Sequence, residues 1–345
     1  MKFKTLIITI ITVIVLTLSA LSCIIFKSKI ATDKSELLII TSDLNNSIKY
    51  YKYNPLSNEK KVILTTPSQN SYPTGILSKD GTILYLTKKD QYGQLQLFQR
   101  NLGTEKETQL TSEKKNGIVN VDFVRLDSTN STLFLRVVQT NHRNFNLAVY
   151  SIKTEKLITL NKNEIDLSDQ YFDFTNKHEG LLVVQYSLKQ QYQIMDNANK
   201  SQNFNNAVSK YSFLLKNYSG DIVHDFGVMN RNIADISISP DGNSAAILTQ
   251  DLSGQNSIKV TSSLIYMKLD SQKINVLTPL PEINTFKQIC FDQSGQGFYF
   301  VATKEPIDVS SKHYVLYYYN LKEKISHQVL NIKNETIISC TNLLK

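Results

Sequence analysis

A strand–turn–strand pattern that recurs along the chain restricts its possible folds more than any other feature. The clearest copy is ISISPDGNSAAIL at residues 236–248, where apolar residues alternate with others on either side of a Pro-Asp-Gly turn. Two more copies are GILSKDGTILYL at 75–86 and ICFDQSGQGFYF at 289–300, and two less regular ones occupy 121–137 and 171–186. Because alternating apolar residues are typical of strands and Asp-Gly favours tight turns, each copy predicts a β-hairpin.

A second pair of predicted strands follows each hairpin, so the chain from about Tyr72 to Leu330 holds five units of four strands. Three predicted strands precede this region, and one, ETIISCTNLL at 335–344, follows it. Together they complete a sixth unit. We expect an all-β fold over residues 35–345, a six-bladed β-propeller of four-stranded antiparallel blades whose ring is closed by the C-terminal strand. Two β-sandwiches in series are the alternative.

The segment SISPDGNSAAIL resembles the repeat of TolB-like β-propellers, the WD40-like PD40 repeat, in which an inner strand ends in Ser-Pro-Asp-Gly and an apolar strand follows. The similarity is weaker at 77–86 and 291–300, and it concerns about Ser35 to Lys345 in all. This resemblance implies a propeller fold. It also implies relatives of two kinds, namely envelope proteins that bind other envelope proteins and the propeller parts of prolyl-oligopeptidase-like enzymes.

The first 34 residues have a different character from the rest. No charged residue occurs from Thr5 to Phe26, a length that as a helix would measure about 33 Å and would cross a bilayer core of about 30 Å. We expect a retained signal anchor that places residues 35–345 outside the cytoplasm. Two alternatives are a lipoprotein modified at Cys23 and cleavage by signal peptidase after Ser22. All three export the rest of the chain.

The formal net charge of +8 does not indicate nucleic-acid binding. Five Lys and one Asp lie in residues 1–34, so half of the excess positive charge flanks the apolar segment. The remaining 33 basic and 29 acidic residues nearly balance, and no nucleic-acid-binding motif is present. We therefore predict no nucleic-acid partner.

This sequence lacks the motifs of two enzyme classes that are known among propellers. A Gly-x-Ser-x-Gly motif of an α/β-hydrolase domain is absent, and the chain has no Trp for a sialidase box. A hydrolase or lyase could instead hold carboxylates at the mouth of a central channel, where strands could supply Asp43, Asp122, Asp173 and Asp235. Scattered acidic residues are more typical of surfaces and turns, so we predict no catalytic residue.

Histidines and cysteines indicate neither a metal site nor a cofactor. The five histidines are isolated, without the spacing of a zinc motif. Cys290 and Cys340 fall at similar places in the predicted inner strands of the last and the closing blade. Inner strands of neighbouring blades often lie too far apart for a disulfide, so two buried thiols are expected.

In a propeller, the loops between the second and third strands of all blades share one face, and here they are the long ones. The longest runs from about Leu188 to Lys210 and is polar and amide-rich. Long loops on a rigid scaffold usually carry function, although an insertion without a role fits equally well. The predicted partner-binding residues on this face are Tyr92, His142, Tyr192, Met195, Phe204 and His313.

The sequence thus predicts a single-pass protein of the bacterial cell membrane whose propeller works outside the cytoplasm as a protein-binding or scaffolding module. Its expected partner is an envelope or membrane protein or a cell-surface ligand. One alternative is an enzyme that uses the channel mouth. Another is a sensory or accessory ectodomain of a membrane complex.

Overall fold

The computed structural model describes residues 36–69, 72–161, 164–175, 180–205, 207–254, 259–277, 283–305 and 312–343. These residues form an all-β structure with two helices, α2 (Glu113–Asn116) and α3 (Leu188–Ser201). The predictions made for Thr5 to Phe26 and for Cys23 lie outside the described residues. Within the described ranges, no helix is long and apolar enough to cross a membrane.

The first sheet joins strands from both ends of the described chain. Its order is β24 (Glu335–Asn342), β1 (Leu37–Asp43), β2 (Ser47–Asn54) and β3 (Glu59–Pro67). All three pairs are antiparallel, and β24 runs along β1 from Leu37 opposite Asn342 to Asp43 opposite Glu335. The amide of Leu343 extends this contact by donating a hydrogen bond to the carbonyl of Glu36 (2.7 Å).

An eight-stranded sheet follows, and it consists of two antiparallel halves. The first half contains β4 (Gly75–Leu77), β5 (Ile83–Lys89), β6 (Leu95–Asn101) and β7 (Glu107–Gln109). The second contains β8 (Ile118–Leu126), β9 (Thr132–Gln139), β10 (Asn146–Ser151) and β11 (Lys156–Thr159). Between the halves, β6 and β8 are parallel and pair only at Leu95 and Asn120.

Three four-stranded antiparallel sheets complete the fold, each in chain order. The first contains β12 (Leu167–Thr175), β13 (Gly180–Ser187), β14 (Lys210–Asn217) and β15 (Ile222–Asn230). The second contains β16 (Ile233–Ile238), β17 (Ser244–Ser253), β18 (Lys259–Lys268) and β19 (Lys273–Leu277). The third contains β20 (Thr285–Phe291), β21 (Gly297–Thr303), β22 (Val315–Asn320) and β23 (Ile325–Leu330). The predicted all-β fold with four-stranded antiparallel sheets is confirmed.

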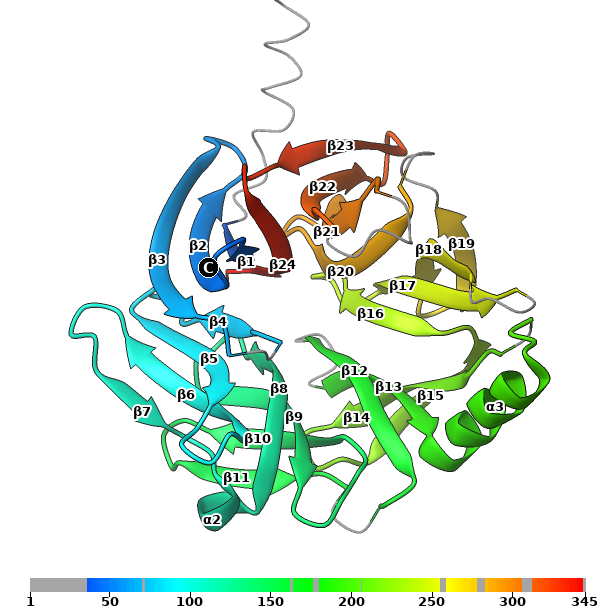
Figure 1. Ribbon diagram of the computed structural model, residues 1–345, viewed down its shortest axis with the longest axis horizontal. Helices are drawn as coiled ribbons and strands as arrows, with labels where there is room; N and C mark the ends of the chain where they lie inside the picture. The colour runs from blue at the N-terminus through cyan, green and yellow to red at the C-terminus, as the bar shows by residue number, and fades with distance from the viewer. Residues whose placement is uncertain are drawn as a thin grey trace, which may run out of the picture.

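Figure 1 shows the sheets placed around a common centre, with β4, β8, β12, β16, β20 and β24 nearest to it. Apolar side chains fill the space between neighbouring sheets. Phe298 and Phe300 of β21 each stack on a tyrosine of β22, Tyr319 and Tyr317, with ring planes 14° apart. Leu248 of β17, in the preceding sheet, belongs to the same buried cluster. Alternate residues of each strand thus hold one sheet against the next.

The turns at 239–244 and 127–132 share one backbone hydrogen-bond arrangement, although only the first contains Asp-Gly. Asp241 accepts a hydrogen bond from the amide of Asn243 (3.0 Å), and Gly242 takes a positive φ of 69°. In the irregular copy at 121–137, Asp127 accepts from the amide of Ser131 (2.8 Å), and Asn130 supplies the positive φ of 60°. Because Asn tolerates the left-handed region better than most residues, the same turn forms without glycine.

The two described cysteines are free and buried, as expected. The reason given for that expectation is wrong, however, because the Sγ atoms of Cys290 and Cys340 lie 3.5 Å apart. A hydrogen bond from the amide of Cys340 to the Gln288 side chain (2.9 Å) holds β24 close to β20. Neighbouring inner strands therefore come nearer to each other here than the sequence argument assumed.

Candidate functional site

Residues of the inner strands β8, β12, β16, β20 and β24, together with the segment before β4, line a cavity of about 300 Å³ near the centre of the molecule. Its polar lining comes from β8, β9, β12, β16 and β20, and includes Asp122, Arg136, Tyr171, Asp235, Lys287 and Gln288. These strands start at the face that carries the loops between second and third strands, so the cavity opens on the long-loop face. We call it the channel-mouth cavity.

Asp122 and Arg136 form a closed ion pair on one wall of this cavity. The guanidinium donates from Nε to Oδ1 (2.7 Å) and from Nη2 to Oδ2 (2.8 Å), and its Nη1 donates to the carbonyl of Gln170. Burial lowers the pKa of Arg136, but the adjacent Asp122 outweighs it, so the pKa is raised overall. The ring of Phe145 lies 4.6 Å from the guanidinium. The charges of Asp122 and Arg136 therefore compensate each other, and the contact of Arg136 with Gln170 joins β8 and β9 to β12.

Asp235 has a carboxylate that is only partly compensated. The residue is 2% exposed, and its Oδ2 accepts from the amide of Ile289 (2.9 Å) on the next sheet. Its Oδ1 is buried and has no hydrogen-bond partner. Burial raises the pKa of Asp235 to about 7, against the opposing effect of Arg125. This is the behaviour of a carboxyl group that has lost its hydration and has received one bond in return.

Lys287 brings an ammonium group to the same cavity. Its Nζ lies 5.1 Å from the ring centre of Tyr72 and 5.0 Å from that of Tyr314, so two aromatic faces flank it. Burial lowers the pKa of Lys287 to about 8. No carboxylate of the described residues forms an ion pair with it. A lysine and a carboxyl group with shifted pKa values therefore share one cavity, a combination typical of functional sites.

The opposite end of the inner strands holds a second, smaller cavity of about 170 Å³, on the side of the tight turns. Arg125 and Asp173 form an ion pair there, with 3.5 Å between Nε and Oδ1. Asp173 also accepts from the amide of Ile238 (2.9 Å) and the hydroxyl of Ser237 (3.2 Å). Burial raises the pKa of Asp173. These contacts satisfy the charges and link β8, β12 and β16, which indicates a structural role.

The acidic residues considered at the sequence level therefore separate into two groups. Asp43 is the last residue of β1, and its side chain accepts from the amides of Asn45 and Ser47 (2.9 Å each) in the turn that follows. Asp122, Asp173 and Asp235 line the central cavities instead of the surface. Their interpretation as surface or turn residues was wrong. Among the described residues, no group of three or more His, Cys, Asp or Glu side chains could hold a metal ion.

Two of the predicted partner-binding residues meet in one hollow on the long-loop face. His142, after β9, and Tyr192, on α3, line an open hollow of about 530 Å³ with Ile165 and Leu188. Its lining is largely apolar, and Ile165 and Tyr192 are 72% and 63% exposed. We call this the α3 hollow. An apolar, exposed concavity of this kind is typical of a surface that contacts another molecule.

The other four predicted residues lie elsewhere. Tyr92 is 78% exposed in the turn after β5, and Met195 is half-buried on α3. The ring Nε2 of His313 is hydrogen-bonded to the side chain of Asn331 (2.9 Å). Phe204 is 4% exposed because it packs with Ala198 and Ala207. Its expected place on the contact surface is therefore corrected, since its side chain anchors the end of α3.

The long insertion after β13 is also a helix and not an irregular loop. Ser187 caps its first turn by accepting from the amide of Gln190 (3.1 Å). Asp166, from the loop before β12, accepts from the amide of Lys189 (2.8 Å) and from the Ser187 hydroxyl (2.7 Å). The hydrogen bond from the Lys189 amide, followed by that from the Ser187 hydroxyl, lowers the pKa of Asp166. Two side chains thus fix the start of α3 against the neighbouring loop.

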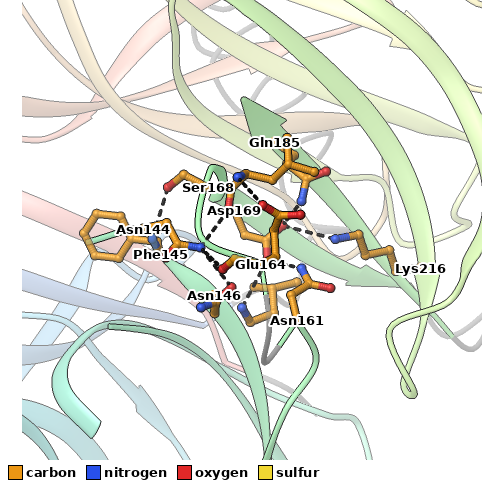
Figure 2. Close-up of polar contacts among 11 residues, drawn as sticks. Asn144, Phe145, Asn146, Asn161, Glu164, Ser168, Asp169, Gln185 and Lys216 are labelled. Atoms are coloured by element: carbon orange, nitrogen blue, oxygen red, sulfur yellow. Dashed lines mark hydrogen bonds and ion pairs between the residues drawn. The ribbon is translucent and has the colours of Figure 1, made fainter. Parts of the chain in front are cut away.

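A buried polar cluster surrounds Asp169 in β12, the strand that follows the Asp166 loop (Figure 2). Asp169 is fully buried; Oδ1 accepts from Lys216 (3.2 Å) and Gln185 (3.0 Å), and Oδ2 from Asn161 (3.0 Å) and the amide of Leu147 (3.2 Å). Burial raises the pKa of Asp169, while Lys216 opposes this effect. The cluster joins β10 to β12, β13 and β14.

Asn144 connects the same cluster to the loop that forms one wall of the α3 hollow. Its amide nitrogen donates to the carbonyls of Glu164 (2.8 Å) and Leu167 (2.9 Å), on either side of Ile165. Figure 2 shows Asn144 and Asn146 beside Glu164 and Asp169. The exposed Ile165 is therefore presented by a loop that buried polar contacts hold in place. No signal in the sequence pattern connects Asn144 with this loop.

Comparison with known proteins gives a distant relative and a clear fold. The uncharacterized protein YdjN of Bacillus subtilis (strain 168) is 23% identical over 320 residues, covering 88% of this chain and 86% of the relative. No family model matches.

Three solved structures are similar in fold. TolB from Acinetobacter baumannii has a TM-score of 0.53 at 10% identity, covering 88% of this chain and 66% of its own. A putative TolB from Agrobacterium tumefaciens reaches 0.55 at 9%, covering 89% and 98%. An oligogalacturonate lyase from Vibrio parahaemolyticus reaches 0.50 at 12%, covering 87% of each chain. The chain thus spans about two thirds of the first of these proteins, and its fold is that of the TolB-like β-propellers.

Proposed function

We propose that the chain is a six-bladed propeller closed by β24, tethered to the membrane through Thr5 to Phe26, and that it binds an envelope protein outside the cytoplasm. Support for six blades comes from the eight-stranded sheet, whose antiparallel halves meet at the single pair of Leu95 and Asn120. Treated as two blades, these halves and the four other sheets make six. Pairing of β24 with β1 supports closure of the ring.

The observation that carries the binding role is the α3 hollow. It gathers the exposed Ile165 and Tyr192 beside His142, in a largely apolar concavity of about 530 Å³. Exposed aromatic side chains in a concavity are typical anchors of protein interfaces. The capped start of α3 and the contacts of Asn144 hold both walls in place, so a partner would meet a preformed surface.

Site-specific photo-crosslinking tests this role. A benzophenone amino acid is placed at Tyr192, or at Val62 as a control that is 46% exposed on the outer strand β3. In cells that express the full chain, we expect a discrete adduct from position 192 that Ile165→Asp removes. Equal adducts from both positions, or an adduct that Ile165→Asp leaves unchanged, would refute the α3 hollow as the binding surface.

The proposed location is tested separately by labelling intact cells with a membrane-impermeant maleimide. Tyr92→Cys offers an exposed thiol, whereas Cys290 and Cys340 are buried. We expect Tyr92→Cys to be labelled before cell lysis. Labelling only after lysis would place the propeller in the cytoplasm.

An enzyme at the channel-mouth cavity is the second candidate. The observation in its favour is that Asp235, with a pKa of about 7, and Lys287, with a pKa of about 8, line one cavity. Such groups can exchange protons near neutral pH. The lyase with a similar fold makes oligogalacturonate the first substrate to assay. Turnover by the natural chain that is lost in both Asp235→Asn and Lys287→Met would favour this candidate. If the natural chain shows no turnover, protein binding is the only proposed role that remains.

A further inference from the structure

The channel-mouth cavity contains two groups whose hydrogen-bonding or charge needs are not met within the described protein. Oδ1 of Asp235 is buried without a partner, although Oδ2 is bonded to the amide of Ile289. The ammonium of Lys287 faces two tyrosine rings, and none of its three N–H donors has an acceptor among the described residues. Leaving the buried Oδ1 of Asp235 unpaired costs free energy, and a ligand could recover it. Lys287 is half-buried, and its donors are available to the same ligand.

The charges on the walls of the cavity decide which kind of ligand fits. Arg136 is occupied by both oxygens of Asp122 and by the carbonyl of Gln170. Lys287 therefore provides the single uncompensated positive charge among the described lining residues. One positive charge suits a monoanion better than a phosphate dianion, which proteins usually bind with several donors or with arginine.

From this arrangement we propose that the channel-mouth cavity binds a small monocarboxylate, with one carboxylate oxygen on the Lys287 ammonium and the other hydrogen-bonded to Asp235. Burial raises the pKa of Asp235 to about 7, so below that pH its carboxyl group is mostly protonated and can donate this bond. The flanking rings of Tyr72 and Tyr171 give the cavity aromatic walls, which suit a flat or ring-shaped ligand body. The binding site is independent of the α3 hollow and of any turnover.

Competitive labelling of the full chain tests the proposal at one residue. The purified protein in detergent is treated at pH 6.5, below the pKa of Asp235, with a trace amount of an amine-acylating reagent, and labelling of each lysine is quantified by mass spectrometry. The probes are benzoate, its neutral analogue benzamide, its cationic analogue benzylamine, and inorganic phosphate. We expect saturable protection of Lys287 by benzoate only, with no protection of the control Lys52, which is paired with Glu36 at the surface.

Variants separate the two halves of the site. Asp235→Ala removes the second hydrogen bond and should raise the benzoate concentration for half protection about tenfold or more. Asp235→Asn keeps an acceptor for the Ile289 amide and a donor for the ligand, so it should bind nearly as the natural chain does. It also serves as the test if Asp235→Ala fails to fold.

Three results would overturn the proposal. Equal protection by benzoate and benzamide would show that charge plays no part. Protection by benzylamine or by phosphate in preference to benzoate would assign the cavity to another ligand class. Protection of Lys52 to the same extent as Lys287 would show that benzoate does not act by binding in the cavity.

Discussion

Asp169 and Asp235 are both almost fully buried, but the protein compensates their charges differently. Asp169 receives hydrogen bonds from four groups, one of them the Lys216 ammonium (3.2 Å). Asp235 accepts a hydrogen bond at Oδ2 from the amide of Ile289, and its buried Oδ1 has no hydrogen-bond partner. Burial raises the pKa of both, since a charged carboxylate is costly away from water. The first arrangement stabilises a structure, while the second leaves capacity for a ligand.

The pH dependence of stability should reveal Asp235. Its pKa rises from 3.8 to about 7 on folding, so the folded state holds this proton more tightly than the unfolded state. Its contribution is fully present below about pH 4 and is lost as the pH rises to about 7, a change on the order of 4 kcal/mol. In Asp235→Asn this loss disappears. We measure the free energy of unfolding in urea at pH 4, 5.5, 7 and 8. As the pH rises, the value for Asp235→Asn should increase relative to that of the natural chain.

Asp43→Asn is the matched control because its linkage has the opposite sign. Backbone hydrogen bonds, first that of Ser47, lower the pKa of Asp43 on folding. Its contribution is present above the unfolded pKa and is lost as the pH falls through the folded pKa. This variant should therefore be less stable than the natural chain at pH 7 and should match it in acid. The same slope in both variants would contradict the assignment to Asp235.

Breaking the buried ion pair should be far more costly than breaking an exposed one. Lys216 and Asp169 are 3% and 0% exposed, so Lys216→Met leaves a buried carboxylate without its cation. We expect a loss of about 3 kcal/mol in the free energy of unfolding at pH 7. Lys200→Met breaks a surface pair with Asp196 and should change it by less than about 0.5 kcal/mol. Equal effects in denaturant titrations would refute the structural role of the Asp169 cluster.

At this scale the sequence limited what could be predicted about the site. Period-two alternation shows that Asp122 and Asp235 point away from their apolar neighbours, but not whether that side is solvent or a central cavity. The difference depends on strand order in the sheet and on the position of the sheet in the ring. One property of the sequence could have indicated the cavity, because Asp122 and Asp235 each lie in the first strand of a repeated hairpin. Lys287 also lies in the first strand of a hairpin, β20, but the sequence does not show that two tyrosines from other segments flank its ammonium group.

Among the elements, α3 differs most from its expected structure. Its sequence, LKQQYQIMDNANKS, has few apolar residues and therefore no clear buried face, which favoured a loop. The helix depends instead on its first turn, where Ser187 and Asp166 bind three donors of the segment. By contrast, the hairpins were predictable because alternation and a Gly or Asn turn are local properties of the chain.

Removing the cap should loosen α3 without unfolding the sheets. Ser187→Ala deletes the acceptor for the Gln190 amide and should destabilise the helix by about 1 kcal/mol. Hydrogen exchange of the amides at 189–192 should accelerate about fivefold, while the unfolding midpoint of the whole protein changes little. Ser201→Ala, in the last turn, is the control and should leave these amides unaffected. Unchanged exchange in Ser187→Ala would show that Asp166 alone fixes the helix start.

For the whole molecule, the pairing of β24 with β1 is the contact that joins the first and last strands of the described residues. Deletion of residues 335–345 would expose the edge of β1, where Leu37 to Ile40 are all buried in the intact protein. An exposed apolar edge templates aggregation. We expect the shortened chain to elute as aggregates in size-exclusion chromatography and to lose its cooperative unfolding transition.

Deletion of residues 344–345 alone is the control for this truncation, because it leaves β24 intact. Both shortened chains are purified in the same detergent as the full chain. A monomeric, cooperatively unfolding product of the larger deletion would show that β24 is dispensable and would contradict the proposed closure of the ring. The leftover strands at the two ends of the sequence were sufficient to predict this pairing partner, since neither end could form a four-stranded sheet alone.

The pairing of β24 with β1 also sets the order of events while the protein is made. Thr41 and Glu335, bonded through their side chains at 2.7 Å, are 294 residues apart in the chain. At 5–20 residues per second, a ribosome needs roughly 15–60 s to make the intervening segment. Through that time β1 has no permanent neighbour on one side, and a nascent chain that stalls late in synthesis would present this apolar edge to every other stalled copy. Newly made molecules therefore leave the aggregation-prone state only when β24 pairs with β1.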